Sequence, residues 1–367
     1  MAINQPQVVT SSYPCTSIGL SITLLIMSTM SLIIGCDDTK TTSISASESA
    51  QESTQGDDTS ARDLPALGED VIGIASDDFF PEGITRSDAG DIYMGSVNTG
   101  AIVVVKRGQQ WAQELISGSR FEGAGTAGLI ADSSRSALWA CTGDFFSQIP
   151  SKIWRFDLTT GETQAHYELP GRSFCNDLAL DDQGRLYATD SFGGRIMRVD
   201  DRGLTVWLEG EAYEPANNSP LSLNGITWDP QGKLWFGRSD TGQLSSVVIN
   251  EDGSAGEVDL DQLDLSEDDR PQGIDGLKWR APGELIAIRG RDVYQLKRFT
   301  SLNDDVTPQW EITLIDDTLA HATTFTFDEP NDFIWVVESQ LSRFYQSATP
   351  DFPFQARRIA LPATTSR

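Results

Sequence analysis

Histidine, cysteine and basic residues are scarce in this chain, and each scarcity excludes a class of function. Only two histidines and four cysteines occur among 367 residues, and they form no Cys/His cluster of the kind that selects zinc. Lysine and arginine number 27 against 54 aspartate and glutamate residues, a formal net charge of -27. Because so acidic a chain repels a phosphate backbone, we expect no nucleic-acid partner. The acidity itself indicates solubility or a salty habitat rather than a specific role.

A long hydrophobic run occurs near the N-terminus, from Ile18 to Gly35, and Cys36 follows it in the sequence IIGC. This pattern resembles a bacterial lipoprotein signal, which implies that residues 1–35 are removed and that Cys36 is lipidated. The usual basic segment is missing, since no lysine or arginine precedes Lys40. A single spanning helix is the alternative, because the run is close to the roughly 18-residue minimum. Both readings place the rest of the chain outside the cytoplasm, attached to a membrane on the periplasmic side or at the cell surface.

Residues 36–64 are rich in Ser, Thr and acidic side chains and contain almost nothing apolar. Such a composition cannot offset the entropy lost on ordering, so it predicts a disordered linker. The folded part is therefore expected to span residues 65–367.

Six segments of the folded part share one pattern. Each contains a short apolar strand, a polar turn such as DDQG or DPQG, and a second strand in which an aromatic residue usually follows Leu or Ile. The segments begin at Pro81, Thr126, Cys175, Leu223, Ile274 and Ala322. This period, with further apolar strands and no helical pattern, is typical of a β-propeller. We predict an all-β, monomeric six-bladed propeller, closed by Val71 to Ala75 or Arg357 to Leu361.

One position of the repeat combines acidic and amide side chains. Aligned on the first strand, the six column residues are Glu82, Ala127, Asn176, Asn224, Asp275 and Thr323. First strands line the channel of a propeller, so these side chains should converge. Taken singly, each polar member is typical of a turn or a surface charge, and Asp177 beside Asn176 is interpreted as a turn residue. Together, two carboxylates and two amide oxygens suit one hard divalent cation, Ca²⁺ first, with Mg²⁺, Mn²⁺ or Zn²⁺ as alternatives.

The motifs PEGI, FCND, LNGI and IDGL, in this blade order, resemble the senescence marker protein, regucalcin and gluconolactonase family of six-bladed propellers. The resemblance implies a divalent metal held by Glu82, Asn224 and Asp275. It places Asn176 in the substrate pocket or at the metal through water. It also implies a metal-dependent hydrolase that acts on a lactone or related ester, with the cation polarising the carbonyl and Asp275 as the base.

Two departures from the family concern the substrate. Sugar lactonases of the family tend to have an arginine two residues before the third-blade asparagine, where this chain has Phe174, and Arg172 is two residues out of register. A more apolar lactone or a different ester therefore suits the chain at least as well. His321 is a candidate for the channel mouth, with a loop histidine as the alternative. A non-catalytic lipoprotein, in which the metal joins the blades and loops bind a ligand or partner, is the second function considered.

Cys141 ends a second strand and Cys175 begins the next first strand, so both should lie between adjacent blades. A disulfide between them and two buried free thiols are both open. Aromatic residues at matching second-strand positions are interpreted as packing between blades. They are Tyr93, Trp139, Tyr187, Trp235 and Trp335.

Overall fold

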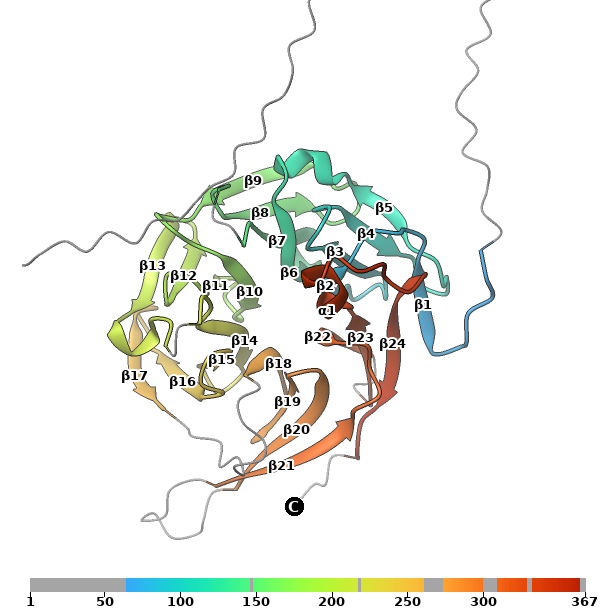
Figure 1. The fold of residues 1–367 in the computed structure, drawn as a ribbon. Coiled ribbons are helices and arrows are strands. Elements are labelled where there is room, and N and C mark those ends of the chain that lie inside the picture. The colour runs from blue at the N-terminus through green and yellow to red at the C-terminus, as the bar shows by residue number, and fades with distance from the viewer. Residues whose placement is uncertain are drawn as a thin grey trace, which may run out of the picture. The chain divides into compact units, whose positions relative to one another are not determined.

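The computed structural model describes residues 64–145, 148–216, 219–260, 273–299, 309–328 and 332–363. Within these ranges the chain forms six four-stranded sheets, which stand as blades around a central axis (Figure 1). The predicted all-β, six-bladed β-propeller is confirmed. The predicted signal segment and Cys36 lie outside the described residues. None of the described helices is long and apolar enough to cross a bilayer.

Each of the first three blades begins with its inner strand and continues outward. Blade one contains β2 (Pro81–Arg86), β3 (Ile92–Ser96), β4 (Ile102–Val105) and β5 (Gln113–Ile116). Blade two contains β6 (Gly125–Asp132), β7 (Ala137–Gly143), β8 (Lys152–Asp157) and β9 (Thr163–Glu168). Blade three contains β10 (Cys175–Leu180), β11 (Leu186–Asp190), β12 (Arg195–Asp200) and β13 (Gly203–Glu209). The inner strands start within one residue of the repeat starts read from the sequence.

Blades four and five follow the same order, whereas blade six combines strands from the beginning and the end of the described chain. Blade four contains β14 (Leu223–Asp229), β15 (Lys233–Arg238), β16 (Leu244–Ile249) and β17 (Ala255–Asp259). Blade five contains β18 (Ile274–Ala281), β19 (Glu284–Arg289), β20 (Asp292–Phe299) and β21 (Gln309–Asp316). Blade six contains β22 (Ala322–Asp328), β23 (Phe333–Glu338), β24 (Phe354–Ala360) and β1 (Val71–Ile74). Both predicted closing segments thus take part, because β1 pairs with β24.

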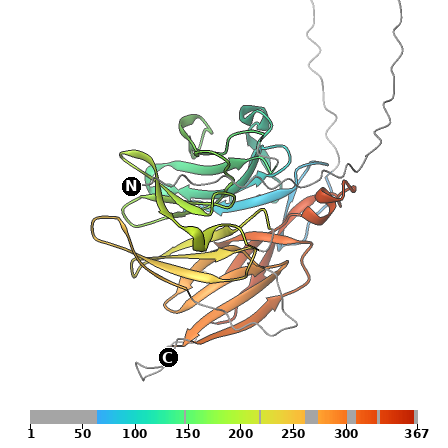
Figure 2. The same cartoon turned by 60° about the vertical axis from the view of Figure 1, so that its left-hand side comes forward.

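Four short helices lie in the connections that the structure describes. The 3₁₀ helices are η1 (Gly118–Phe121), η2 (Ser133–Arg135) and η3 (Glu211–Tyr213), and α1 (Leu341–Tyr345) lies between β23 and β24. In Figure 1, α1 lies near the middle of the ring, beside β2 and β22. Figure 2 shows it at one end of the blade-six strands.

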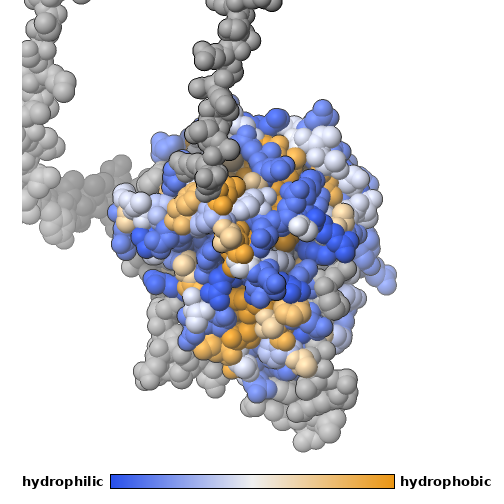
Figure 3. All heavy atoms as spheres, turned by 90° about the vertical axis from the view of Figure 1, so that its right-hand side faces the viewer, coloured by the Kyte–Doolittle hydropathy of each residue, from blue (hydrophilic) through white to orange (hydrophobic). Residues whose placement is uncertain are grey.

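The apolar core lies between the blades. Six clusters of buried side chains occur among the described residues, and each joins one pair of neighbouring blades. The predicted second-strand aromatics belong to these clusters and are at most 9% exposed, so their interpretation as packing residues is confirmed. On the side where blades six and one meet, hydrophilic residues cover much of the surface and apolar residues appear in separate patches (Figure 3).

Every inner strand contains a β-bulge at the column position. In β10 the register shifts between Cys175 and Leu178, so Asn176 and Asp177 together oppose a single residue of β11. A bulge bends its strand and redirects the side chains at the irregularity. The pair Asn176 and Asp177 is therefore part of a strand, and its interpretation as a turn before the strand is wrong.

Neighbouring inner strands touch at these bulges, and a glycine makes the contact possible. A Cβ atom added to Gly225 would lie 2.0 Å from the carbonyl oxygen of Asp275, and one added to Gly83 would lie 2.1 Å from that of Ala127. Both distances are far below van der Waals contact, so these positions tolerate no side chain. The residue after the column position is glycine in four of the six blades.

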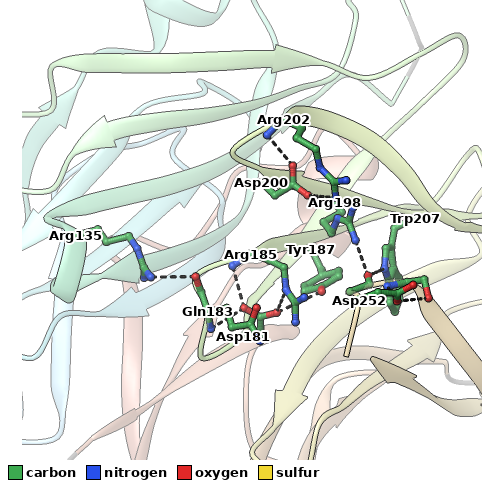
Figure 4. Close-up of polar contacts among 12 residues, drawn as sticks. Arg135, Asp181, Gln183, Arg185, Tyr187, Arg198, Asp200, Arg202, Trp207 and Asp252 are labelled. Carbon is green, nitrogen blue, oxygen red and sulfur yellow. Dashed lines mark hydrogen bonds and ion pairs between the residues drawn. The ribbon is translucent and has the colours of Figure 1, made fainter. Parts of the chain in front are cut away.

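The opposite end of the inner hairpins is held by ion pairs and backbone hydrogen bonds (Figure 4). In the turn between β10 and β11, Asp181 accepts hydrogen bonds from Gln183 N at 3.0 Å, Arg185 N at 2.9 Å and Arg185 Nε at 2.5 Å. Arg135 of blade two donates to Gln183 O at 3.2 Å. This turn therefore also ties blade three to blade two.

Candidate metal centre

The four column residues with strong oxygen donors meet in one small pocket. Glu82, Asn176, Asn224 and Asp275, from blades one, three, four and five, all line it. The other lining residues are Gly128, Asp177, Gly276 and Thr324. The free volume is about 10 Å³, which is close to what one water molecule or one monatomic ion needs. A larger molecule does not fit inside the pocket.

Serine hydroxyls orient the two asparagine side chains. Asn176 Nδ2 donates to Ser191 Oγ at 2.9 Å, and Asn224 Nδ2 donates to Ser239 Oγ at 2.8 Å. Ser191 Oγ in turn donates to the carbonyl oxygen of Leu223 in the next blade. The hydrogen bond to Ser191 occupies the amide nitrogen of Asn176 and leaves its Oδ1 atom available to the pocket, whereas the amide group of Asn224 also hydrogen-bonds with the Asp275 carboxylate.

The two column carboxylates lie in an environment of excess negative charge. Burial and the carboxylates of Asp275 and Asp177 raise the pKa of Glu82 well above its ordinary value, and the ammonium of Lys278 offsets this only in part. Burial and Asp177 raise the pKa of Asp275 to about 7, although a side-chain hydrogen bond with Asn224 acts in the opposite direction. A cation in the pocket would relieve this repulsion.

Asp177 belongs to the site, which the sequence reasoning did not foresee. Its Oδ1 atom accepts from Leu178 N at 2.8 Å, and its Oδ2 atom accepts from Ile226 N of blade four at 3.2 Å. Lys278 Nζ lies 3.8 Å from Asp177 Oδ1. The repeat contained a signal for this role, because Asp177 stands where four other blades have glycine.

The donor set fits a hard divalent cation. It consists of two carboxylates, two oriented amides and Thr324, whose hydroxyl is buried without a hydrogen-bond partner among the described residues. Oxygen donors of this kind suit Ca²⁺ better than zinc. The described part of the chain contains no group of three or more His, Cys, Asp and Glu side chains placed to hold a metal ion. A metal centre here would therefore need oxygen donors besides the carboxylates, and the amides and the Thr324 hydroxyl are the candidates.

Three other predicted site residues, Arg172, Phe174 and His321, are not part of the pocket lining. Phe174 is buried, and the Arg172 guanidinium lies 4.5 Å from the ring centre of Phe192. His321 Nδ1 accepts a hydrogen bond from Ser342 N in α1 at 3.2 Å. Burial and the positive charge of Arg291 lower the pKa of His321. His321 thus supports α1, as a neutral imidazole can.

Cys141 of β7 and Cys175 of β10 form a disulfide, with Cα atoms 5.1 Å apart. The alternative of two free thiols, open at the sequence level, is therefore not what the structure shows. The bond joins blades two and three directly beside Asn176. A cross-link that spans 34 residues stabilises a fold by roughly 3–4 kcal/mol in the chain-entropy model.

Phe145 and Tyr345 lie outside the lining of the pocket but contact each other, and Phe145 stacks on Phe174; the sequence reasoning assigned neither of them a role. Phe145 lies in the connection between β7 and β8, and Tyr345 is the last residue of α1. Neither connection follows the repeat, so neither residue has a counterpart in other blades. No signal in the repeat could have identified them.

Comparison with solved structures shows the same fold in proteins of different kinds. The major allergen Mala s 1 of Malassezia sympodialis superposes with a TM-score of 0.61 at 16% identity, covering 82% of this chain and 99% of the allergen. A luciferin-regenerating enzyme gives 0.58 at 12% identity, covering 79% and 95%. The gluconolactonase XC5397 of Xanthomonas campestris gives 0.55 at 15% identity, covering 80% and 89%. No protein-family model and no curated protein sequence matches this chain.

Proposed function

We propose that this propeller is a divalent-metal-dependent hydrolase of a lactone or related carboxylic ester. The observation that carries the proposal is the convergence of Glu82, Asn176, Asn224 and Asp275 in a pocket with room for one ion. The similarity in fold to a gluconolactonase and a luciferin-regenerating enzyme supports it. Identity of 12–15% to those proteins carries the fold and leaves the activity to experiment.

The residues of the chain have separable roles in this proposal. Glu82, Asn176, Asn224 and Asp275 would hold the cation, Ca²⁺ first, which when bound supplies Lewis-acid polarisation of the ester carbonyl. Asp275 is the group proposed to take a proton from the attacking water. Lys278 and the backbone N–H groups that contact Asp177 keep that third carboxylate in place. Ser191 and Ser239 maintain the orientation of the amides.

Removal and restoration of the metal tests this function. Protein stripped with a chelator is assayed on γ-butyrolactone, glucono-1,5-lactone and phenyl acetate, before and after addition of Ca²⁺, Mg²⁺, Mn²⁺ or Zn²⁺. We expect turnover of at least one substrate to vanish on stripping and to return with one cation. Turnover that survives complete removal of metal would contradict the proposal.

Asp275 is assigned two roles, and one variant separates them. Metal content and turnover are measured together in Asp275→Asn. If the ion stays bound while turnover is lost, Asp275 acts as the base. If the ion is lost as well, its role as a ligand is sufficient to explain the effect.

A second candidate function is a non-catalytic propeller whose metal joins the blades. The pocket supports this second candidate because its oxygen donors come from four different blades, so that one ion would cross-link those blades. Thr323 Oγ1 already donates to Glu82 O at 2.9 Å and joins blade six to blade one. A cation that raises the melting temperature without turnover on any substrate of the panel would favour this candidate.

We also propose, from the sequence alone, that Cys36 carries a lipid and anchors the propeller on the outer side of a membrane. The mass of the mature protein isolated from membranes tests this. A mass that includes residues 1–35 or lacks the lipid would contradict it.

A further inference from the structure

Five aromatic rings form a continuous arc at the end of the propeller where the inner strands begin. We call it the aromatic arc. It contains Phe192, Phe174, Phe145, Tyr345 and Phe344, in the order of their contacts. Ring centroids are 5.4 Å apart for the first pair, then 4.5 Å, 6.2 Å and 5.6 Å. Distances of this size are typical of interacting aromatic pairs.

The aromatic arc joins blade three to blade six at the end of the propeller where the inner strands begin, which is also the end that holds the pocket. Phe174 directly precedes Cys175 and Asn176, at the start of β10. Phe145 comes from blade two, and it packs both on the core between blades two and three and on the core between blades six and one. Tyr345 comes from α1, which lies near the middle of the ring in Figure 1. The contact between Phe145 and Tyr345 therefore bridges two blades that have blade one between them.

The side chains of the aromatic arc differ in their exposure to solvent. Tyr345 is 59% exposed, more than any other large hydrophobic side chain in the described part of the chain. Phe174 is only 3% exposed, and its ring stacks beneath that of Phe145. An exposed aromatic side chain held beside a polar pocket is a typical contact for a ligand.

The protein holds Tyr345 in place by contacts on its own helix. Leu341 is buried in the core between blades six and one, and Ser342 N donates to His321 Nδ1 at 3.2 Å. Partial burial and the negative charges of Asp275 and Glu82 raise the pKa of Tyr345 to about 12. The phenol is therefore close enough to the pocket to feel both carboxylates, and it keeps its proton at neutral pH.

We propose that Tyr345 and Phe145 determine substrate specificity, by taking an aromatic ring of the substrate against the aromatic arc while its carbonyl enters the pocket. This inference rests on the proposed hydrolase function. The pocket has room for little more than an ion, so the rest of a substrate must lie outside it, and the aromatic arc is the apolar surface proposed to receive that part. Four of the five rings belong to phenylalanine and offer no hydrogen-bond partner, so an aryl group gains more from this surface than a polyol, whose hydroxyls need partners elsewhere. The substrate class is thus an aryl-substituted lactone or ester rather than a polyol lactone.

A matched pair of lactones tests the proposal. γ-Phenyl-γ-butyrolactone and γ-butyrolactone differ by one ring, and kcat/KM is measured for both with wild type, Tyr345→Ala, Phe145→Ala and Tyr345→Phe. We expect wild type to prefer the phenyl lactone at least tenfold, the size of effect that one aromatic contact gives. Tyr345→Ala and Phe145→Ala should each reduce this preference about tenfold, mainly through KM. Tyr345→Phe should keep most of it.

Tyr167, a half-buried tyrosine on β9, provides the control for a lost aromatic side chain away from the pocket. Tyr167→Ala should keep the wild-type preference. Equal losses on both lactones in Tyr345→Ala would overturn the proposal, as would an unchanged preference. A preference of wild type for γ-decalactone over the phenyl lactone would also overturn it, because an alkyl chain would then be the bound group.

A binding measurement separates failure of this proposal from failure of the hydrolase function. Saturation-transfer NMR with 4-hydroxy-4-phenylbutanoate, the product of the phenyl lactone, needs no turnover. If no lactone is hydrolysed but this compound binds to wild type and not to Tyr345→Ala, the aromatic arc is a binding surface and the hydrolase function fails. Absence of binding to the wild type would overturn the aromatic arc as a ligand site.

Discussion

Two groups of carboxylates differ in their partners: one lies in the pocket, near the start of the inner strands, and the other lies at the turns that follow β10 and β12. The pocket carboxylates, Glu82 and Asp275, have no arginine partner among the described residues, and burial raises their pKa values. The turn carboxylates, Asp181 and Asp200, bind arginine. Asp181 Oδ2 accepts from Arg185 Nε, and a hydrogen bond from the Arg202 side chain lowers the pKa of Asp200 (Figure 4).

The difference distinguishes carboxylates whose charge the protein itself compensates from carboxylates whose charge it leaves uncompensated, as a proposed cation site requires. An acidic side chain beside arginine and backbone N–H groups is satisfied by the protein itself, and its loss weakens the fold. The pocket carboxylates repel each other and Asp177, so they lower stability in the absence of a bound cation, and the proposed cation would relieve this repulsion. Variants of the two groups should therefore have opposite effects on stability and activity.

The largest expected effect is on activity. Asp275→Asn and Glu82→Gln should each lower kcat/KM on the order of 10³-fold, because each removes a charged ligand and the first also removes the proposed base. Asp181→Asn, at the turn end, is the matched carboxylate control and should leave the activity per folded molecule near wild type. If the control lost as much activity as Asp275→Asn, the distinction between the two groups would fail.

The second effect is on folding. Asp181→Ala should lower the free energy of unfolding by about 3–5 kcal/mol, because it leaves Arg185 without its partner at a site where the Asp181 side chain is fully buried. Asp275→Asn should instead raise the stability of metal-free protein at pH 7. Denaturant titration of both variants measures the change in the free energy of unfolding relative to wild type. A loss of stability in both variants would contradict the proposed difference between the two groups of carboxylates.

The third effect is a pH dependence that the pocket carboxylates impose on metal-free protein. The pKa of Asp275 is about 7 in the folded state, above its unfolded value of about 3.9. Its contribution to stability is therefore fully present below about pH 4 and is lost as pH rises toward 7, by roughly 2–4 kcal/mol. The stability of wild type relative to Asp275→Asn, measured from pH 4 to 7 in chelator, should fall accordingly. A stability difference between the two proteins that does not change from pH 4 to 7 would contradict the raised pKa of Asp275.

The smallest expected effect concerns the orientation of an amide ligand. Ser239→Ala removes the hydroxyl that accepts from Asn224 Nδ2, and it should weaken metal binding by roughly 10–100-fold. Ser245 is the control within the same blade, because its hydroxyl is buried without a hydrogen-bond partner among the described residues. Ser245→Ala should bind metal as wild type does. Equal affinities in Ser239→Ala and wild type would show that Asn224 needs no such support.

The repeat made the fold and most of the pocket predictable. Each inner hairpin has its own alternation of apolar residues and its own turn residues. The blades, the closing strands and the column residues could therefore be predicted from short segments of the sequence. Asp177 departs from the repeat, because four other blades have glycine at its position, but the repeat alone does not show that its side chain enters the pocket. Read as a dipeptide, Asn176 and Asp177 indicate a turn, and only the bulge in β10 brings both side chains to the pocket. Phe145 and Tyr345 lie in connections outside the repeat, where only tertiary contacts decide their positions.

Calorimetric titration of chelator-treated protein with Ca²⁺ tests the central claim, that the column residues bind one divalent ion. The titration is repeated with Asp275→Asn, Glu82→Gln and the turn control Asp181→Asn. We predict one ion per chain in wild type and in Asp181→Asn, and a loss of binding in both pocket variants. Absence of binding in wild type, or the same stoichiometry and affinity in the pocket variants, would contradict it.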